Sequence, residues 1–139
     1  MGVKHKVVPQ DFDEDSVTEE DPAIFSKLVV EGKNKSAREL VLNTEQSDEP
    51  ILTADTLVFT PSKKIVGKPK DHAHSRVLLR EFSGVTHSVF STVMLSYKGE
   101  SQIETCETLV TFKEMSEQEI EEYILSEEGV GKAGAYGIH

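Results

Sequence analysis

An apolar run at residues 51–59, ILTADTLVF, is the clearest hydrophobic segment of the chain, and it carries one acid, Asp55, in its middle. A buried strand seldom holds an acid unless the acid has a partner or a function. The turn at Pro61-Ser62 predicts a hairpin that folds Ile65-Val66 back along this strand and brings Lys68 towards Asp55. An acid and an ammonium group at the end of a strand pair predict a site for phosphate and metal.

The remaining hydrophobic and capping patterns predict alternating strands and helices. We expect strands at Lys4–Pro9, Thr86–Tyr97 and Gln102–Phe112, and helices at Pro22–Leu42 and His72–Phe82, with a third helix after Ser116. The faces expected to be buried are Ile24, Leu28, Ala37, Leu40 and Val41 on the first helix, Ala73, Val77, Leu78 and Phe82 on the second, and Ile120, Tyr123 and Ile124 on the third. Gly32 is expected to weaken the first helix, and the acidic segment 11–21 is expected to form a loop. This order favours one α/β or α+β domain with a mixed sheet and flanking helices.

The charge of the chain narrows the classes of partner. With 139 residues and a formal net charge of −10, the chain lacks the basic surface that binding to a nucleic acid polymer needs. Lys63, Lys64, Lys68 and Lys70 form a local basic cluster, in which Lys68 alone is fixed between a glycine and a proline and is a candidate ligand. Three of the four are expected to be solvated.

Other residue types limit the location and the chemistry. No apolar run approaches the ~20 residues of a membrane helix, and the only cysteine, Cys106, cannot form an internal disulfide. A reducing compartment, the cytoplasm, is therefore expected. His72 and His74 lie two residues apart on a predicted helix, so they point in different directions and make poor metal ligands. The glycine-rich segment 130–139 lets backbone approach a ligand closely, although it lacks the GK[ST] of a P-loop.

Four short motifs, taken together, resemble one family. They are Ala54-Asp55-Thr56, Gly67-Lys68-Pro69, Ser83-Gly84-Val85-Thr86-His87 and the segment KAGAYGI at 132–138. Their order and spacing resemble the Maf family of nucleoside triphosphate pyrophosphatases, from about Val7 to the last residue. The Ala-Asp-Thr motif and the tail look like the subgroup that acts on dTTP and UTP.

This resemblance implies an elongated, two-lobed α/β fold with a central cleft. It implies hydrolysis of a nucleoside triphosphate to monophosphate and pyrophosphate, with Mg²⁺ or Mn²⁺ as cofactor, and a role in removing modified pyrimidine triphosphates. Family members are often dimers, so a homodimer is expected.

The resemblance also assigns roles to individual residues. Asp55 matches the catalytic proton acceptor of the family, and Asp55 with Glu14 is expected to hold the metal. The residues expected to bind substrate are Glu14, Lys33, Thr56, Lys68, Lys132 and His139. Lys35 competes with Lys33 for the helix position, Thr56 matches a position linked to substrate choice, and His139 stands where the family has glutamine.

The chain also departs from the family pattern. The family begins with a strand and a Ser-x-Ser-Pro-Arg-Arg loop that binds phosphates, and it continues past His139 with a further strand and helix; residues 1–139 are expected to form a single Maf-like domain without these parts. Gly131 replaces the aspartate that usually precedes Lys132. Loss of the arginine loop removes phosphate-binding charge, so the alternative function is that of a degenerate homologue that binds a nucleotide or a partner without catalysis.

Overall fold

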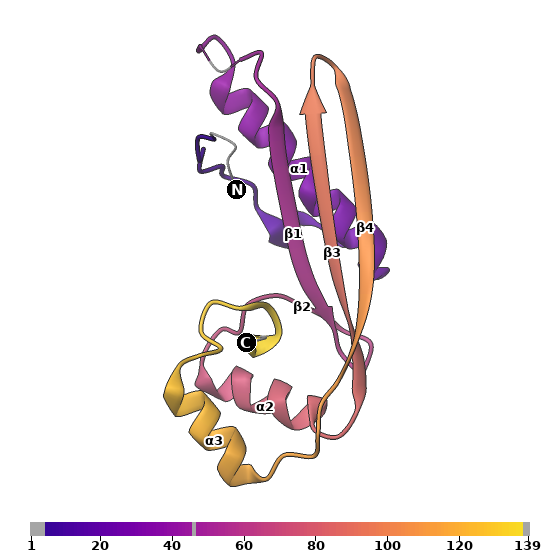
Figure 1. The fold of residues 1–139 in the computed structure, drawn as a ribbon, viewed down its shortest axis with the longest axis vertical. Coiled ribbons are helices and arrows are strands. Elements are labelled where there is room, and N and C mark those ends of the chain that lie inside the picture. The colour runs from indigo at the N-terminus through magenta and orange to yellow at the C-terminus, as the bar shows by residue number, and fades with distance from the viewer. Residues whose placement is uncertain (1–4, 46, 138–139) are drawn as a thin grey trace.

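A computed structural model describes residues 5–45 and 47–137 of the chain. Its centre is a four-stranded sheet in the order β2-β1-β3-β4 (Figure 1). The strands are β1 (Ile51–Phe59), β2 (Ile65–Val66), β3 (Thr86–Tyr97) and β4 (Glu100–Thr111). All three pairings among them are antiparallel. The sheet is therefore uniformly antiparallel and not mixed, because β1–β2 and β3–β4 are hairpins and β1 meets β3 in the opposite direction.

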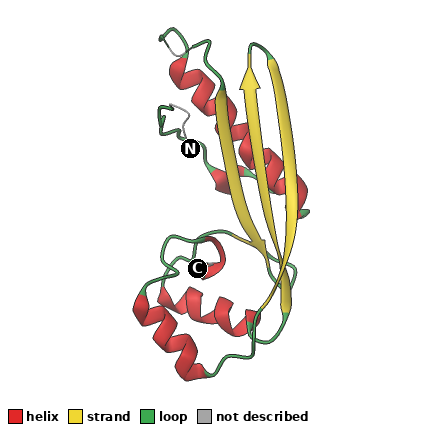
Figure 2. Cartoon of the chain, viewed as in Figure 1, coloured by secondary structure: helices red, strands yellow, loops and turns green. Residues whose placement is uncertain are grey.

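Helices flank this sheet in two groups (Figure 2). They are α1 (Pro22–Val41), α2 (His72–Phe82) and α3 (Glu117–Ser126), with short 3-10 turns η1 (Glu14–Ser16) and η2 (Ala133–Ala135). The helix α1 packs along one end of the sheet, while α2, α3 and η2 gather at the other end (Figure 1). The predicted α/β class, with flanking helices and two lobes, is confirmed. No helix among residues 5–45 and 47–137 is long and apolar enough to cross a membrane.

Strand β1 joins the two lobes. It pairs with β3 along its whole length, from Ile51 opposite Ser96 to Phe59 opposite Ser88. On its other side it pairs with β2 only at Val58 and Phe59. Within the described residues, the edge of β1 beside Asp55 therefore carries no neighbouring strand, and a ligand has access to it.

The buried face of α1 differs from the face that apolar residues predicted. Asp21 caps the helix as expected, with its carboxylate accepting from the backbone N–H groups of Ala23 and Ile24. The buried residues are Ser26, Val29, Val30, Asn34, Ala37 and Val41. The predicted core positions Ile24, Leu28 and Leu40 are instead 46%, 43% and 50% exposed. The prediction was wrong there because two polar residues share the buried face, where the Asn34 side chain bonds to the sheet.

The second lobe has its own core. Phe82 is fully buried and packs with Val58, Leu78 and Ala135, while Leu79 packs with Ile120 and Ile124 of α3. The predicted stripes on α2 and α3 are confirmed at Leu78, Phe82, Ile120 and Ile124, with Tyr123 packed beside them. Val77 and Ala73 were predicted wrongly, because the helix turns Leu79 inward and leaves both of them exposed.

The predicted strand at Lys4–Pro9 is also wrong. Residues 5–10 have no regular structure, and Lys4 lies outside the described residues. Val7 is 77% exposed, so the two valines of this segment do not supply a face that a sheet could bury. The acidic loop that follows is confirmed apart from the single turn η1, which Asp13 caps through the N–H of Asp15.

Gly32 has a packing role in α1. A side-chain carbon at residue 32 would overlap the ring of Phe12, so the absence of one lets Phe12 lie directly on the helix. This contact holds the segment that carries Glu14 against α1, next to Lys33.

We therefore expect Gly32→Ala to destabilise the protein although it improves helix propensity. The overlap with Phe12 is of the overpacking kind, which costs about 1–3 kcal/mol, against a propensity gain of about 1 kcal/mol. Urea unfolding measures the net change. In a Phe12→Ala background the same replacement should be stabilising, since the overlap is gone; a gain in stability from Gly32→Ala alone would contradict the packing role.

Candidate functional site

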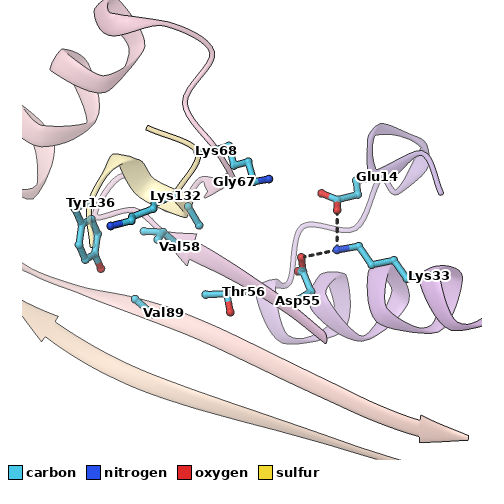
Figure 3. Close-up of a pocket in the computed structure, with 12 residues that line it drawn as sticks. Glu14, Lys33, Asp55, Thr56, Val58, Gly67, Lys68, Val89, Lys132 and Tyr136 are labelled. Carbon is cyan, nitrogen blue, oxygen red and sulfur yellow. Dashed lines mark hydrogen bonds and ion pairs between the residues drawn. The ribbon is translucent and has the colours of Figure 1, made fainter. Parts of the chain in front are cut away.

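One lysine bridges two acids at the free edge of β1. The Nζ atom of Lys33 lies 2.9 Å from Oε1 of Glu14 and 3.4 Å from Oδ1 of Asp55 (Figure 3). The side chains of Lys33 and Asp55 are only 18% and 12% exposed, whereas Glu14 is 50% exposed. The strand acid thus has the cationic partner that its burial requires.

Separate elements bring these three residues together. Asp55 comes from β1, Lys33 from α1 and Glu14 from η1. The helix is fixed on the sheet by Asn34, whose amide nitrogen donates to the Ile51 carbonyl and to the Thr53 hydroxyl. Because Asn34 directly follows Lys33, these hydrogen bonds also fix the position of Lys33 along β1.

The site changes the proton affinities of both members of the buried pair. Burial raises the pKa of the Asp55 carboxyl, and the charge of Lys33 opposes this only in part. Burial alone would lower the pKa of Lys33, but its hydrogen bond to Glu14 and the charge of Asp55 raise it overall. The site therefore holds an acid that accepts a proton more readily than a solvated one, beside an ammonium group that stays charged.

Two further lysines line the opposite side of the cavity. Lys68 follows β2, and Lys132 immediately precedes η2 (Figure 3). Their segments are joined by a hydrogen bond of 2.9 Å from the Gly134 N–H to the Gly67 carbonyl. Gly134 has a φ of +73° and packs against Val58 where a side chain would collide, so glycine is required at this joint.

These groups surround one cavity of about 600 Å³. Its lining residues are Glu14, Lys33, Asp55, Thr56, Val58, Gly67, Lys68, Val89, Gly131, Lys132, Ala133 and Tyr136. Val58, Val89 and Tyr136 form an apolar wall away from Glu14, Lys33 and Asp55, and Lys132 lies beside this wall (Figure 3). A cavity with this division suits a ligand that has a charged part and a flat, less polar part.

The structure brings most of the predicted site residues to this cavity. Glu14, Lys33, Asp55, Thr56, Lys68 and Lys132 all line it, whereas His139 lies outside the described residues. Lys35, the competitor of Lys33, is exposed and does not line the cavity. The Thr56 hydroxyl is hydrogen-bonded to Ser91 across the strand pair, at 3.2 Å.

The sequence reasoning missed the apolar wall of the cavity. Val58 and Val89 look like ordinary strand residues, and only their register on neighbouring strands, Val58 opposite Val89, places them together. Tyr136 belongs to the KAGAYGI motif at 132–138, but nothing in the sequence indicated a role for its ring. The histidines His72 and His74 do not line the cavity, and Cys106 is exposed on β4 and does not line it either.

Comparisons with known proteins agree with this geometry. The family described as Maf-like protein matches residues 1–139 of the chain. A dTTP/UTP pyrophosphatase of Albidiferax ferrireducens is 35% identical over 99% of this chain and 72% of its own length. Proteins of the same name from Treponema denticola and Nitrosomonas europaea are 36% and 32% identical, again over 99% of this chain and over 72% and 70% of their own lengths.

The raised pKa of Asp55 predicts that the acid costs stability at neutral pH. A folded-state pKa above the ordinary value means that the folded protein binds the proton more tightly than the unfolded chain does. Asp55→Asn should therefore raise the free energy of unfolding at pH 7, because the amide has no charge to bury.

The difference between the two proteins should shrink as the pH falls through the raised pKa of Asp55, because the native acid is then protonated. It should vanish below the ordinary aspartate value, where folded and unfolded states are both protonated. Urea unfolding between pH 3 and pH 8 gives the curve. A variant that is less stable than the wild type at pH 7 would show that the ion pair, and not burial, dominates.

Proposed function

Because this chain belongs to the Maf-like protein family, we propose that it is a nucleoside triphosphate pyrophosphatase that acts on dTTP and UTP. The products are the nucleoside monophosphate and pyrophosphate. The relatives carry this activity in their names, and modified pyrimidine triphosphates belong to the same chemical class. The observation that carries the proposal is the position of Asp55, which opens onto a cavity that three lysines also line.

Asp55 is the proton acceptor in the proposed reaction. A water oxygen attacks the α-phosphorus, the bond from that phosphorus to the α–β bridging oxygen breaks, and pyrophosphate leaves with the electron pair. The proton lost by the water passes to the Asp55 carboxylate. The raised pKa of Asp55 makes it a better base than a solvated aspartate, while the charge of neighbouring Lys33 favours its ionised form.

The lysines balance the negative charge that the reaction develops. Lys68 and Lys132 lie across the cavity from Asp55, where they can bind the β- and γ-phosphates and stabilise the departing pyrophosphate. Lys33 is the third cation of the site, beside the base. The apolar wall of Val58, Val89 and Tyr136 remains for the nucleobase and the sugar of the substrate.

The oxygen donors of the site fit a divalent cation such as Mg²⁺ or Mn²⁺. The carboxylates of Glu14 and Asp55 both lie against the Lys33 ammonium group, so the two are close enough to bind one cation together. In the described part of the chain no three metal-ligating side chains come together, so a cation at Glu14 and Asp55 would need its other ligands from phosphate and water. When bound, the ion would supply Lewis-acid stabilisation of the phosphate oxygens.

Two finer parts of the proposal concern selectivity and assembly. Thr56 stands next to Asp55 at the cavity and is held by Ser91, so it is placed to contact the substrate and contribute to its selection. A homodimer and a cytoplasmic location stay predictions from the resemblance and the composition; size-exclusion chromatography with light scattering checks the first.

Asp55→Asn should abolish pyrophosphate release from dTTP and UTP, by at least about 100-fold, because it removes the base. Binding of dTTP, measured by calorimetry, should remain. Asp71→Asn, which keeps a capping group at the start of α2 away from the cavity, is the matched control and should retain activity. Binding without release by the wild-type chain would favour the degenerate, non-catalytic alternative.

Lys132→Met and Lys68→Met should each lower kcat/KM for dTTP by about 10–100-fold, since each removes one charge from the phosphate side. Lys70→Met is the control from the same basic cluster, because Lys70 does not line the cavity. Steady-state pyrophosphate assays compare the three variants. Equal losses in all three would mean that general charge, and not placement at the cavity, governs the rate.

A further inference from the structure

His87 is a buried histidine with no role in the reaction described above. It lies on β3, is 4% exposed and is enclosed by aromatic rings. Its ring stacks on Phe82 at a centroid distance of 4.3 Å and meets the edges of Phe112 and Tyr136 at 5.3 and 5.6 Å. A hydrophobic residue would fill this space without the cost of burying two ring nitrogens, so the imidazole calls for a polar explanation.

The polar partner of His87 is a residue of the cavity wall. Nε2 of His87 lies 2.8 Å from the hydroxyl oxygen of Tyr136, whereas Nδ1 is buried without a hydrogen-bond partner among residues 5–45 and 47–137. Burial lowers the pKa of His87 and raises the pKa of Tyr136 to about 12, so both groups are neutral at physiological pH. The bond is therefore a neutral one inside an aromatic cage, where it fixes ring positions and carries no net charge.

Tyr136 is tied to the lysine side of the cavity. It directly follows η2, whose turn is closed by a bond from the Ala135 N–H to the Lys132 carbonyl. The same turn bonds through the Gly134 N–H to Gly67, the neighbour of Lys68. Whatever fixes Tyr136 thus fixes the backbone on which Lys132 stands and the carbonyl next to Lys68.

We propose that His87 is a positioning residue for the two phosphate-side lysines. Through its hydrogen bond to Tyr136 it anchors the segment 132–136 to β3, and so holds Lys132 directly, and Lys68 through Gly67, at the cavity. The inference rests on the proposed function for its meaning, because the lysines are placed for a phosphorylated substrate. Among the described residues, this bond is the side-chain hydrogen bond that joins η2 and Tyr136 to the long hairpin β3–β4.

The bond can be removed from either side with little change of shape. His87→Phe keeps a ring to stack on Phe82, and Tyr136→Phe removes only the hydroxyl. Each should raise the KM for dTTP about 5–10-fold, because misplaced lysines bind the phosphates less well, and should also lower kcat, because the same lysines stabilise the departing pyrophosphate. The double variant should be no worse than either single variant, since both remove the same interaction.

Matched controls separate this from general damage. His72→Phe and Tyr97→Phe make the same chemical changes at exposed positions and should leave KM within twofold of the wild type. A purely structural role for His87 would lower the unfolding temperature of His87→Phe and leave KM unchanged. That result, or additive effects in the double variant, would overturn the inference.

Two measurements keep the inference distinct from the proposed function. In the Asp55→Asn background, calorimetry should show dTTP binding weakened 5–10-fold by His87→Phe, whether or not the wild-type chain turns over. The ¹⁵N NMR shift of His87 Nε2 should move in Tyr136→Phe, and an unchanged shift would show that the bond is absent. If the wild-type chain releases no pyrophosphate but His87→Phe still weakens dTTP binding, only the proposed function is contradicted. If the wild-type chain releases pyrophosphate but His87→Phe leaves dTTP binding unchanged, only the role of His87 is contradicted.

Discussion

The burial of one carboxylate on a central strand governs the architecture of the first lobe. Asp55 loses most of its contact with water, and Lys33 offsets that loss from the facing helix. A lysine can do this only if the helix is held at a fixed height, which Asn34 achieves through its bonds to β1. Glu14 then completes the group, and its approach depends on the close contact of Phe12 with Gly32. Features that look unfavourable alone, a polar helix face and a glycine inside a helix, thus serve one ionic site.

The second lobe carries the two other lysines that line the cavity, Lys68 and Lys132. Lys68 and Lys132 come from loops, where side chains are usually mobile. Here the loops are joined by the Gly134–Gly67 hydrogen bond and backed by the aromatic cluster around Phe82. The backbone that carries both lysines is therefore fixed by a hydrogen bond between the loops and by ring packing behind them.

The sequence predicted what depends on neighbours along the chain and failed where distant residues meet. The capping residues, the strand around Asp55 and the turn before Lys68 follow from local patterns, and the family motifs added Glu14 and Lys33. The buried face of α1 was predicted wrongly because hydrophobic periodicity counts only apolar residues. Asn34 is nevertheless buried beside Val29 and Val30, because its side-chain amide is hydrogen-bonded to the sheet. The pairing of His87 with Tyr136 spans 49 positions, and no spacing rule connects a strand histidine to a tyrosine after a glycine-rich turn.

The distribution of charge explains how an acidic protein can have an anion as substrate. The net charge of −10 opposes the approach of an extended polyanion, whose many phosphates would meet the whole acidic surface. A single triphosphate presents its charge over a short length, and under the proposed function it would meet only the cavity that Lys33, Lys68 and Lys132 line. Asp55 and Val58 are three residues apart on β1, which is about 10 Å at the usual rise of a strand. The proposed proton acceptor and one residue of the apolar wall are therefore held on one rigid strand. Under the proposed function, the same strand therefore carries both the proton acceptor and part of the apolar wall that would receive the nucleoside.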